Sequence, residues 1–586
     1  MQQALATYQR GDWAEAERLC QVVLGAKADY FDALNLRGAI TAQTGRTREA
    51  AVLLTQAVAI NPTHADAYNN RGVVLKELDR AEEALIDYGQ AIRIRPGYAE
   101  AHLNRGNALC ELKRFAPALA SYASALKLKP DHDFLFGTWL HTQMRICDWR
   151  DSRAHLATLN RRIAADKKVT PLFSYLALSD SLPLQRKAAQ IMVQDRYPPT
   201  LALATIAKYP RHEKIRVGYF SADLHNHATA YLMAELFEKH DRSRFELTAF
   251  SFGPDKNDDM RRRLVAAFDR FIDARHLSDK AIAQQSRKLE VDIAVDLKGF
   301  TLDSRPGIFT HRAAPVQVSY LGYPGTMGAE YIDYLIADAT VIAAAEYPHY
   351  TEKIVTLPNS YQVNDAHRPI SDQRFTRQAL GLPDTGFVFC CFNNNHKITP
   401  ATFDGWMRIL AQVQGSVLWL LEDNAAAAGN LRREAVQRGI SAERLIFAKR
   451  MPLAEHLARH RAADLFLDTL PYNAHTTASD ALWAGLPVLT CTGASFASRV
   501  AASLLRAIQL PELITTTQET YEALAVTLAR NPQRLQQIGD KLAAHRLATP
   551  LFDTARFTRH IENAYTQMVE RYQADLPPAH FEVSAK

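Results

Sequence analysis

The stretch 463–485, ADLFLDTLPYNAHTTASDALWAG, decides the fold of the second half of this chain. The apolar run that opens at Leu465 predicts a short buried strand of a parallel sheet. Pro471 ends the run, and a predicted helix begins near His475 and stops at Gly485. A strand, a turn and a helix in this order place unpaired amides and the positive end of a helix dipole at one point. The pattern therefore predicts an anion site, and phosphate is the usual ligand.

The first residues of this helix suggest which ligand the site would bind. His475, Thr476 and Thr477 offer an imidazole and two hydroxyls, and Asp480 lies one turn later, where a carboxylate could bind ribose hydroxyls. Thr477 and Asp480 are also a plausible capping box, in which the carboxylate bonds back to the backbone. The chain has no GxGxxG and no GxxxxGK[ST] motif, so neither a typical dinucleotide fold nor a P-loop ATPase is indicated.

Length and composition favour a multidomain cytoplasmic protein. At 586 residues the chain is too long for one hydrophobic core, and three or four domains are expected. A net charge of +6 over this length is too weak to favour nucleic acid or a membrane surface as partner. The six cysteines are scattered and form no CxxC pair. We find no signal peptide and no long apolar span.

The first 130 residues repeat with a period of 34. Prolines at 62, 96 and 130, glycines at 38, 72 and 106, and three columns of alanine share this spacing. Small residues at fixed places let paired helices approach closely, so the period predicts tetratricopeptide repeats. Trp149 lies one period after Phe115, which predicts a further degenerate unit after Pro130. We assign residues 1–150 to this α-solenoid.

Such solenoids present a concave groove to extended peptides. Asn70 and Asn104 occupy equivalent positions, where an amide could hold a peptide backbone, although two solvated asparagines are an equally good interpretation. A helical, polar connector is predicted at 151–205, ending near Pro198-Pro199.

The remainder alternates strands and helices, which predicts two doubly wound α/β lobes, at 206–375 and 376–550, and a terminal amphipathic helix within 551–586. Strands are predicted at 214–223, 245–252, 291–297 and 316–320 in the first lobe, and at 387–392, 417–421, 444–448, 465–470 and 487–492 in the second. Because ligands bind beyond the carboxyl ends of such strands, His225, His227, Lys397 and 475–477 are candidate site residues. A lone histidine or lysine after a strand is more often structural, but these share one predicted cleft.

Several motifs, in order, resemble protein O-GlcNAc transferases. They are the repeat array, Gly218-Tyr219…Asp223…His227…Leu232-Met233, Leu321-Gly322-Tyr323-Pro324-Gly325-Thr326, Cys391-Phe392-Asn393…Lys397, His475-Thr476-Thr477…Asp480-Ala481-Leu482-Trp483-Ala484-Gly485, and Ala497–Ser503. The resemblance covers essentially the whole chain, and a bacterial member of that family is the nearest description.

The resemblance implies a GT-B fold and an inverting transfer of N-acetylglucosamine from UDP-GlcNAc to serine or threonine hydroxyls of proteins, without a metal or other cofactor. It makes His227 the candidate general base and Lys397 the group that neutralises the departing diphosphate. His475 to Thr477 would contact phosphate and sugar, Asp480 the ribose, and His456 and Arg459 the uracil. The predicted donor-binding residues are Leu321, Gly322, Pro324, Gly325, Thr326, Asn394, His456, Arg459, His475, Thr476, Thr477 and Asp480.

The chain departs from the animal members of that family at two positions. Leu453 stands where they carry a lysine and Asp292 where they carry a histidine, so uracil and acceptor contacts are expected to differ. The alternative function is a non-enzymatic scaffold, a peptide-binding solenoid on a nucleotide-sensing GT-B remnant. Residue types do not identify the acceptor proteins or the oligomeric state.

Overall fold

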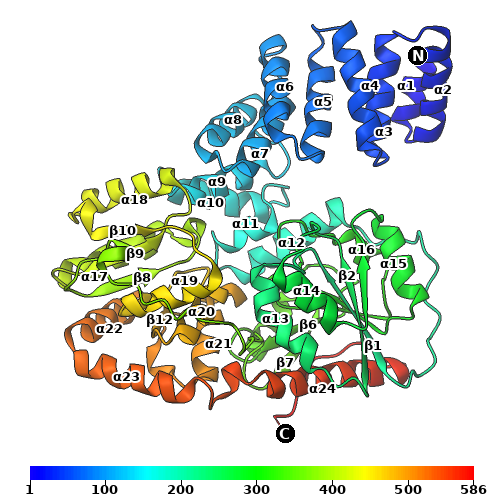
Figure 1. Cartoon of the computed structure of the whole chain (residues 1–586). Coiled ribbons are helices and arrows are strands. Elements are labelled where there is room, and N and C mark those ends of the chain that lie inside the picture. Colours follow the sequence, from blue (N-terminus) through cyan, green and yellow to red (C-terminus); the bar gives the residue numbers. More distant parts are fainter. Residues whose placement is uncertain (586) are drawn as a thin grey trace. The chain divides into compact units, whose positions relative to one another are not determined.

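The computed structural model describes residues 1–585 and consists of two compact units (Figure 1). The first unit is Met1–Ile146, and the second begins at Cys147.

The first unit is a stack of antiparallel helix pairs with the predicted period. Helices α3, α5 and α7 begin at 31, 65 and 99, and α4, α6 and α8 begin at 47, 81 and 115. A Cβ at Gly106 would lie 2.4 Å from the ring of Tyr122, so glycine is needed where the paired helices touch. The helices are α1 (Gln2–Gln9), α2 (Trp13–Ala26), α3 (Phe31–Gln43), α4 (Thr47–Ile60), α5 (Ala65–Glu77), α6 (Ala81–Ile94), α7 (Ala99–Glu111), α8 (Phe115–Leu128) and α9 (Leu135–Arg145).

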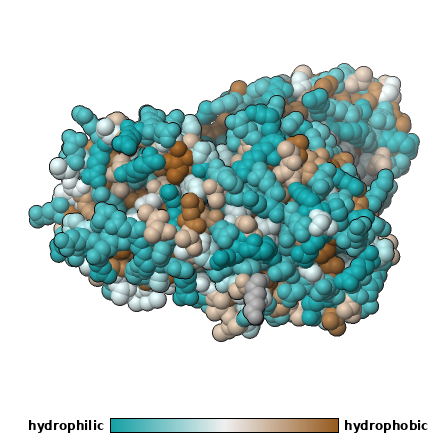
Figure 2. All heavy atoms as spheres, turned by 60° about the horizontal axis from the view of Figure 1, so that its bottom comes forward, coloured by the Kyte–Doolittle hydropathy of each residue, from teal (hydrophilic) through white to brown (hydrophobic). Residues whose placement is uncertain are grey.

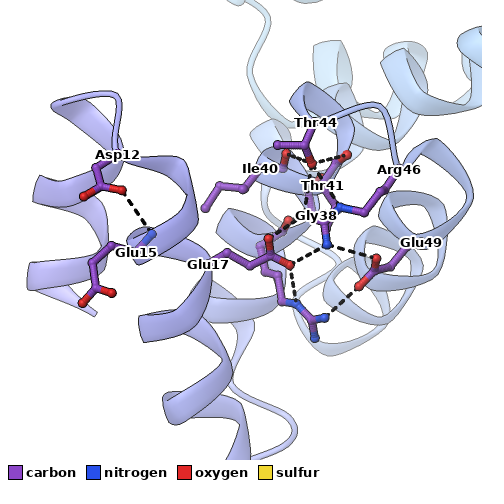
Figure 3. Close-up of polar contacts among 10 residues, drawn as sticks. Asp12, Glu15, Glu17, Gly38, Ile40, Thr41, Thr44, Arg46 and Glu49 are labelled. Atoms are coloured by element: carbon purple, nitrogen blue, oxygen red, sulfur yellow. Dashed lines mark hydrogen bonds and ion pairs between the residues drawn. The ribbon is translucent and has the colours of Figure 1, made fainter. Parts of the chain in front are cut away.

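A charged cluster joins the first two repeats (Figure 3). Glu17 of α2 accepts hydrogen bonds from Arg46 at 2.5 Å and 2.8 Å and lies 3.6 Å from Arg37 of α3. Both arginines also reach Glu49 of α4. The Glu17 side chain is only 13% exposed, so this pairing contributes more than a typical surface salt bridge.

The second unit opens with a helical connector and continues with two lobes. The connector contains α10 (Ser152–Ala164), α11 (Leu172–Leu176) and α12 (Leu182–Arg196). Trp149, which lies one period after Phe115 within the degenerate unit predicted after Pro130, packs its ring 5.3 Å from that of Phe403 in the second lobe. Its partner therefore comes from the α/β part of the fold.

Lobe one is a sheet of eight strands, parallel throughout, in the order β14-β7-β6-β5-β4-β1-β2-β3. Its strands are β1 (Ile215–Ser221), β2 (Phe245–Ser251), β3 (Arg270–Asp273), β4 (Ile293–Asp296), β5 (Val316–Ser319), β6 (Tyr334–Asp338), β7 (Lys353–Leu357) and β14 (Phe581–Glu582). The helices between them are α13 (Ala228–Lys239), α14 (Asp259–Ala267), α15 (Asp279–Lys288) and α16 (Gly307–Thr310).

Lobe two is a parallel sheet of six strands in the order β10-β9-β8-β11-β12-β13. Its strands are β8 (Val388–Cys391), β9 (Val417–Leu421), β10 (Leu445–Ala448), β11 (Leu465–Leu467), β12 (Val488–Cys491) and β13 (Ile514–Thr515). Its helices are α17 (Pro400–Gln412), α18 (Ala425–Gln437), α19 (Leu453–Arg459), α20 (Thr476–Ala484), α21 (Val500–Ala507), α22 (Gln518–Arg530) and α23 (Pro532–His545).

These elements confirm the predicted fold class, an α-solenoid followed by two parallel α/β lobes. The sequence did not indicate β3, β6, β7, β13 and β14. Strands β13 and β14 have only two residues and β3 carries polar residues at both ends, so neither length nor hydrophobic pattern distinguishes these three from loops. Strands β6 (YLIAD) and β7 (KIVTL) do carry apolar runs, which the sequence interpretation missed.

The chain returns to lobe one at its end. Helix α24 (Thr554–Gln573) places the Tyr565 hydroxyl 3.1 Å from that of Tyr219 on β1, and Glu562 lies 3.0 Å from His240. Strand β14 then pairs with β7. Lobe one is therefore built from two separate parts of the sequence.

The surface is mainly hydrophilic on the face shown in Figure 2, where hydrophobic residues form small separate groups. Among residues 1–585, no helix has the length and apolar character needed to cross a membrane.

Candidate functional site

Each sheet has one point where the strand order reverses, and the candidate residues gather at these two points. In lobe two the chain runs from β8 outward to β10 and then returns to place β11 on the other side of β8. In lobe one it runs from β1 outward to β3 and returns to place β4 beside β1. The carboxyl ends of the strands at such a switch point are the usual ligand site of doubly wound sheets.

At the switch point of lobe two, Lys397 meets the loop that leads into α20. Its Nζ follows β8 and donates to the backbone carbonyl of Asn473, which follows β11, at 2.8 Å, and lies 3.9 Å from the centre of the Tyr472 ring. Burial lowers the pKa of Lys397 to about 8, against a smaller opposing effect of Asp468. The ammonium is thus partly desolvated beside a neutral acceptor, an arrangement that an anionic ligand would stabilise.

Helix α20 begins where the sequence predicted, with His475 as the residue before its first turn. Burial, and next the charge of Lys397, hold the pKa of His475 well below its usual range, so the ring is neutral. Its Nε2 lies 3.1 Å from the carbonyl of Ala497 and must donate, which leaves Nδ1 without a proton. The His475 ring therefore fixes the loop, while the first N–H groups of α20 and the half-buried Thr476 are available to an anion.

Side-chain hydrogen bonds join the loops that follow β8 and β11. Thr477 donates to the amide oxygen of Asn393, whose Nδ2 donates to Thr469 at 2.8 Å. The two strand ends are therefore held in register by groups beside the site.

Asp480 pairs with an arginine from the segment between the lobes. Its Oδ1 accepts from Arg368 Nη1 at 2.5 Å, and both side chains are buried. The capping-box interpretation is wrong, because the carboxylate bonds to this guanidinium and not to the start of its own helix. Arg368 also donates to Ser479 at 3.3 Å, so α20 is tied to the linker between the lobes.

Arg459 and His456 pack against the ring of Phe392, just after the end of β8. The Arg459 guanidinium, 2% exposed, lies 4.5 Å from the centre of the Phe392 ring and donates from Nη1 to the carbonyl of Lys449 at 2.6 Å. Its Nε and Nη2 are buried without a partner. Burial lowers the pKa of Arg459 to about 10 and that of His456 to about 2. Two unmatched buried donors beside an aromatic face fit a planar ligand that carries carbonyl oxygens.

Arg450 is a residue of this region that the sequence interpretation missed. It follows β10 and donates from Nη2 to Asp423 at 2.8 Å and to Asn394, which is exposed, at 3.2 Å. It contributes to lowering the pKa of His456, and therefore lies near that ring. Its position directly after a predicted strand is the sequence feature that could have identified it as a candidate site residue.

The switch point of lobe one holds a buried ion pair next to His227. Lys298, just after β4, donates to Asp223 Oδ2 at 2.7 Å, and the same oxygen lies 3.4 Å from His227 Nδ1. His225 is buried nearby, with its ring centre 6.0 Å from that of His227. The sequence interpretation selected the histidines but not Lys298, although that residue also follows a strand directly.

The glycine-rich loop after β5 is held in place by hydrogen bonds to the buried carboxylate of Glu352. Leu321 has a positive φ of 64°, and a Cβ at Gly322 would lie 2.0 Å from the carbonyl oxygen of Leu297. Thr326 donates to Glu352 Oε2 at 2.7 Å, and Met327 N donates to Oε1 of the same carboxylate. The hydroxyl of Thr326 therefore shapes the loop, as do the buried Pro324 and Gly325, while Leu321 and Gly322 are partly exposed.

Asp292 does not lie at the predicted site. It precedes β4, at the amino ends of the strands, and accepts from Arg216 N at 2.8 Å and lies 3.0 Å from His212. The strand therefore places Asp292 at the edge of the sheet opposite His227, and its effect on acceptor contacts stays a prediction.

The two lobes bring their candidates toward one another. Tyr231, one turn after His227 in α13, has its pKa raised by burial and also by the charges of Asp258 and Asp480. The lobes are also joined by a hydrogen bond of 2.6 Å from Ser503 of α21 to Asp338 at the end of β6. Asp480 of lobe two thus faces the helix that His227 starts.

In the solenoid, the two predicted amides bond to neighbouring asparagines. Asn70 Nδ2 donates to Asn35 at 3.3 Å, and Asn104 Nδ2 donates to Asn69 at 3.0 Å. Asn35 and Asn70 line a cavity of about 700 Å³ between the first repeats. A peptide role for Asn70 and Asn104 stays a prediction.

One group of side chains within residues 1–585 has the spacing of metal ligands, namely Glu235, Asp365 and His367. Asp365 already pairs with Arg263, and Glu235 accepts from Ala366 N and from Thr554. The group is therefore largely compensated by protein partners.

Comparisons with known proteins agree with this architecture. Residues 202–375 and 372–561 match the sequence profile described as glycosyl transferase family 41, and residues 53–86 and 99–132 match tetratricopeptide repeat profiles. The chain belongs to glycosyl transferase family 41, with tetratricopeptide repeats at its N-terminal side.

Among individual relatives, the chain is 34% identical over 466 residues to the probable UDP-N-acetylglucosamine–peptide N-acetylglucosaminyltransferase SEC of Arabidopsis thaliana, covering 76% of this chain and 48% of that protein. It is 28% identical to the corresponding enzyme of Caenorhabditis elegans, covering 63% of this chain and 42% of that protein. The chain thus spans about half the length of these curated relatives. A solved structure of a mutant of the Thermobaculum terrenum O-GlcNAc transferase superposes with a TM-score of 0.70 at 27% identity, covering 93% of this chain and 98% of that one.

Proposed function

We propose that this protein is an inverting glycosyltransferase that moves N-acetylglucosamine from UDP-GlcNAc to serine or threonine hydroxyls of proteins. Two of its relatives are named UDP-N-acetylglucosamine–peptide N-acetylglucosaminyltransferases, and the similar solved structure is named an O-GlcNAc transferase. The observation that carries the proposal is the position of Lys397, whose desolvated amine bonds to Asn473 beside the open first turn of α20.

This arrangement suits a diphosphate leaving group. When the bond from C1 of the sugar to the phosphate oxygen breaks, negative charge develops on the diphosphate. Lys397, the amides of α20 and the hydroxyl of Thr476 can stabilise this charge without reorganisation. The hydroxyl of Thr477 already donates to Asn393 and would have to turn to reach the phosphate. In the proposal these groups replace a metal ion. The unmatched N–H groups of Arg459 would bind the carbonyl oxygens of uracil, and Asp480 would bind the ribose.

The solenoid and the compartment complete the proposal. Repeats of this kind bind extended peptides, so we assign acceptor binding to the groove that contains Asn35 and Asn70. We place the reaction in the cytoplasm because all six cysteines are free thiols in the structure.

A transfer assay tests the proposal directly. The full chain is incubated with a panel of UDP-sugars and with serine- and threonine-containing peptides, in excess EDTA, and products are detected by mass spectrometry. We expect N-acetylglucosamine transfer that survives the chelator. UDP binding without transfer or hydrolysis of any donor would favour the nucleotide-sensing scaffold. Loss of activity in EDTA with rescue by manganese would instead direct attention to Glu235, Asp365 and His367.

A further inference from the structure

The ion pair at the switch point of lobe one is buried to a degree that calls for an explanation. Lys298 is 3% exposed and Asp223 is 7% exposed, with Nζ and Oδ2 at 2.7 Å. Removing two charges from water costs more than their attraction returns unless geometry is favourable. Strand β1, followed by Asp223, and strand β4, followed by Lys298, are neighbours at the switch point, so the pair stands in the functional part of the sheet.

His227 contacts this pair through Nδ1, which has one hydrogen-bond acceptor and one hydrogen-bond donor beside it. Nδ1 lies 3.4 Å from Asp223 Oδ2, which can only accept a hydrogen bond. It also lies 3.3 Å from the backbone nitrogen of Thr229, whose N–H can only donate one. A neutral ring satisfies one of these neighbours at a time. With the proton on Nδ1 the ring bonds to Asp223, and with the proton on Nε2 it accepts from Thr229.

The choice between these forms decides what Nε2 can do. A ring with its proton on Nδ1 presents a free lone pair at Nε2 and can accept the proton of an acceptor hydroxyl. A ring with its proton on Nε2 can only donate there. Lys298 donates a hydrogen bond to the same carboxylate oxygen, so its positive charge weakens the attraction of Asp223 for the Nδ1 proton.

We propose that Lys298 is a positioning residue that sets the tautomer and basicity of His227 through Asp223. The proposal rests on the proposed function, with His227 as the general base that the resemblance implies. In that reaction the hydroxyl proton moves to Nε2, the hydroxyl oxygen bonds to C1 of the sugar, and UDP leaves with the electrons of the broken C1–O bond. The imidazolium then returns its proton to water, and Lys298 assists this step because it prevents Asp223 from holding the cation too strongly.

The other charges near His227 come from three loops. Asp223 and His225 follow β1, and Lys298 follows β4. Lys256 and Asp258 follow β2, and Asp258 accepts from Asn226 N at 2.9 Å.

Burial is the largest effect on the pKa of His227 and lowers it, and Asp223 opposes this. Lys298 lowers this pKa further, followed by His225 and then Lys256. Lys256 is exposed, so its charge is screened by solvent whereas that of Lys298 is not.

Nitrogen-15 NMR of the full chain with labelled histidine measures the tautomer directly, with the His227 signals assigned by comparison with His227→Gln. We expect the wild type to populate both tautomers, with the Nδ1–H form as the reactive one, and the Nδ1–H fraction to increase in Lys298→Met. In the same variant the acid limb of kcat/KM for transfer should move to higher pH by about one unit, a tenfold change in the protonation equilibrium of the ring.

Three control variants separate this role from a structural one. Lys256→Met also removes a positive charge near His227, but Lys256 is not the residue that pairs with Asp223. This variant should move the acid limb of kcat/KM by a few tenths of a pH unit at most. Lys298→Arg keeps the charge and should restore the wild-type profile. Asp223→Asn/Lys298→Met removes both charges without leaving one buried alone, and should place the limb at or below that of the wild type.

The proposal is overturned if Lys298→Met leaves the tautomer ratio of the His227 ring as in the wild type, or if it lowers the Nδ1–H fraction. A uniform loss of transfer at all pH values would assign Lys298 to folding alone. If the wild type transfers no sugar, the proposed function fails, but the NMR arm still reports on the Lys298–Asp223–His227 contact.

Discussion

The two lobes share a topology but differ in how they pair their buried cations. In lobe one, Lys298 meets the full charge of Asp223 at 2.7 Å, so the pair is internally matched. In lobe two, Lys397 meets only the carbonyl of Asn473, and Arg459 keeps two buried N–H groups without a partner. A matched ion pair can change the pKa and tautomer of a neighbouring histidine. Cations without a charged partner would be stabilised by a ligand that accepts their hydrogen bonds. In the proposed function, the same switch-point geometry would serve proton transfer in one lobe and anion binding in the other.

The sharpest test of the lobe-one assignment removes the ring itself. His227→Ala should reduce single-turnover transfer about 10²–10⁴-fold if the ring is the general base, while UDP affinity by calorimetry should stay near that of the wild type. Asn226→Ala, which removes the exposed neighbouring side chain, is the control. A loss of less than tenfold would show that His227 only positions the acceptor or the sugar.

Lys397→Ala breaks the corresponding group in lobe two. Because this lysine is proposed to meet charge that grows as the diphosphate leaves, the transfer rate constant should fall about 10²–10³-fold. Single-turnover kinetics at saturating donor measure this, and Lys449→Ala, a lysine near the same sheet edge, is the control. Equal rates in wild type and Lys397→Ala would remove this residue from the mechanism.

Asp480→Asn distinguishes binding from a structural ion pair. If the carboxylate binds ribose, UDP and donor affinity should both fall by about 1–3 kcal/mol, or about 5–150-fold. Since Arg368 loses its charged partner in this variant, thermal unfolding must be measured beside calorimetry. A lowered Tm with UDP affinity unchanged would assign Asp480 only to holding α20 against the linker between the lobes.

The unmatched state of Lys397 also predicts a pH dependence of donor binding. Its pKa of about 8 lies below the ordinary value of 10.5, because burial disfavours the charged amine. An anionic donor stabilises that charge, so binding above pH 8 should take up a proton. UDP-GlcNAc affinity should be insensitive to this group below pH 8 and fall about tenfold by pH 9.

Calorimetry in buffers of different ionisation enthalpy counts the protons taken up. The uptake should disappear in Lys397→Met, and persistence of the uptake in that variant would show that another group is responsible.

The smallest expected effect lies outside both lobes. Glu17 is paired with Arg46 and next with Arg37, so its pKa is held below the ordinary value of 4.5. This contributes stability that is fully present above pH 4.5 and is lost as the pH falls through the lower folded-state pKa. Glu17→Gln should destabilise α2 and α3 locally by about 1 kcal/mol.

Hydrogen exchange of the α2 and α3 peptides measures the local stability that Glu17 contributes, and the difference from the wild type should shrink at low pH. Donor hydrolysis should be unchanged in Glu17→Gln. A change in hydrolysis would contradict the assignment of the chemistry to the two lobes.

The sequence predicted the fold where physical patterns are periodic or strongly apolar. The repeat period fixed the starts of α3 to α8, and the apolar run before Pro471 correctly placed β11 and α20. Short edge strands such as β13 and β14 carry no such pattern. Their pairing depends on the strand already beside them, which a local sequence cannot report.

The site was predicted less completely, because its partners are distant in sequence. Lys397 and His475 follow strands and could be selected, but Arg368 is separated from Asp480 by 112 residues. Asp292 shows how a strand separates residues that are close in sequence. It lies only four residues before Asp296, yet a parallel strand carries them to opposite edges of the sheet.

The discontinuity of lobe one has a consequence for its synthesis. Lobe two is continuous in sequence, so the ribosome delivers all of it before α24 and β14, which complete lobe one. Until then the edge of β7 is open and the hydroxyl of Tyr219 has no Tyr565 beside it. The first lobe to emerge is therefore the last to finish folding, and the nascent chain must hold an unpaired sheet edge while its neighbour forms.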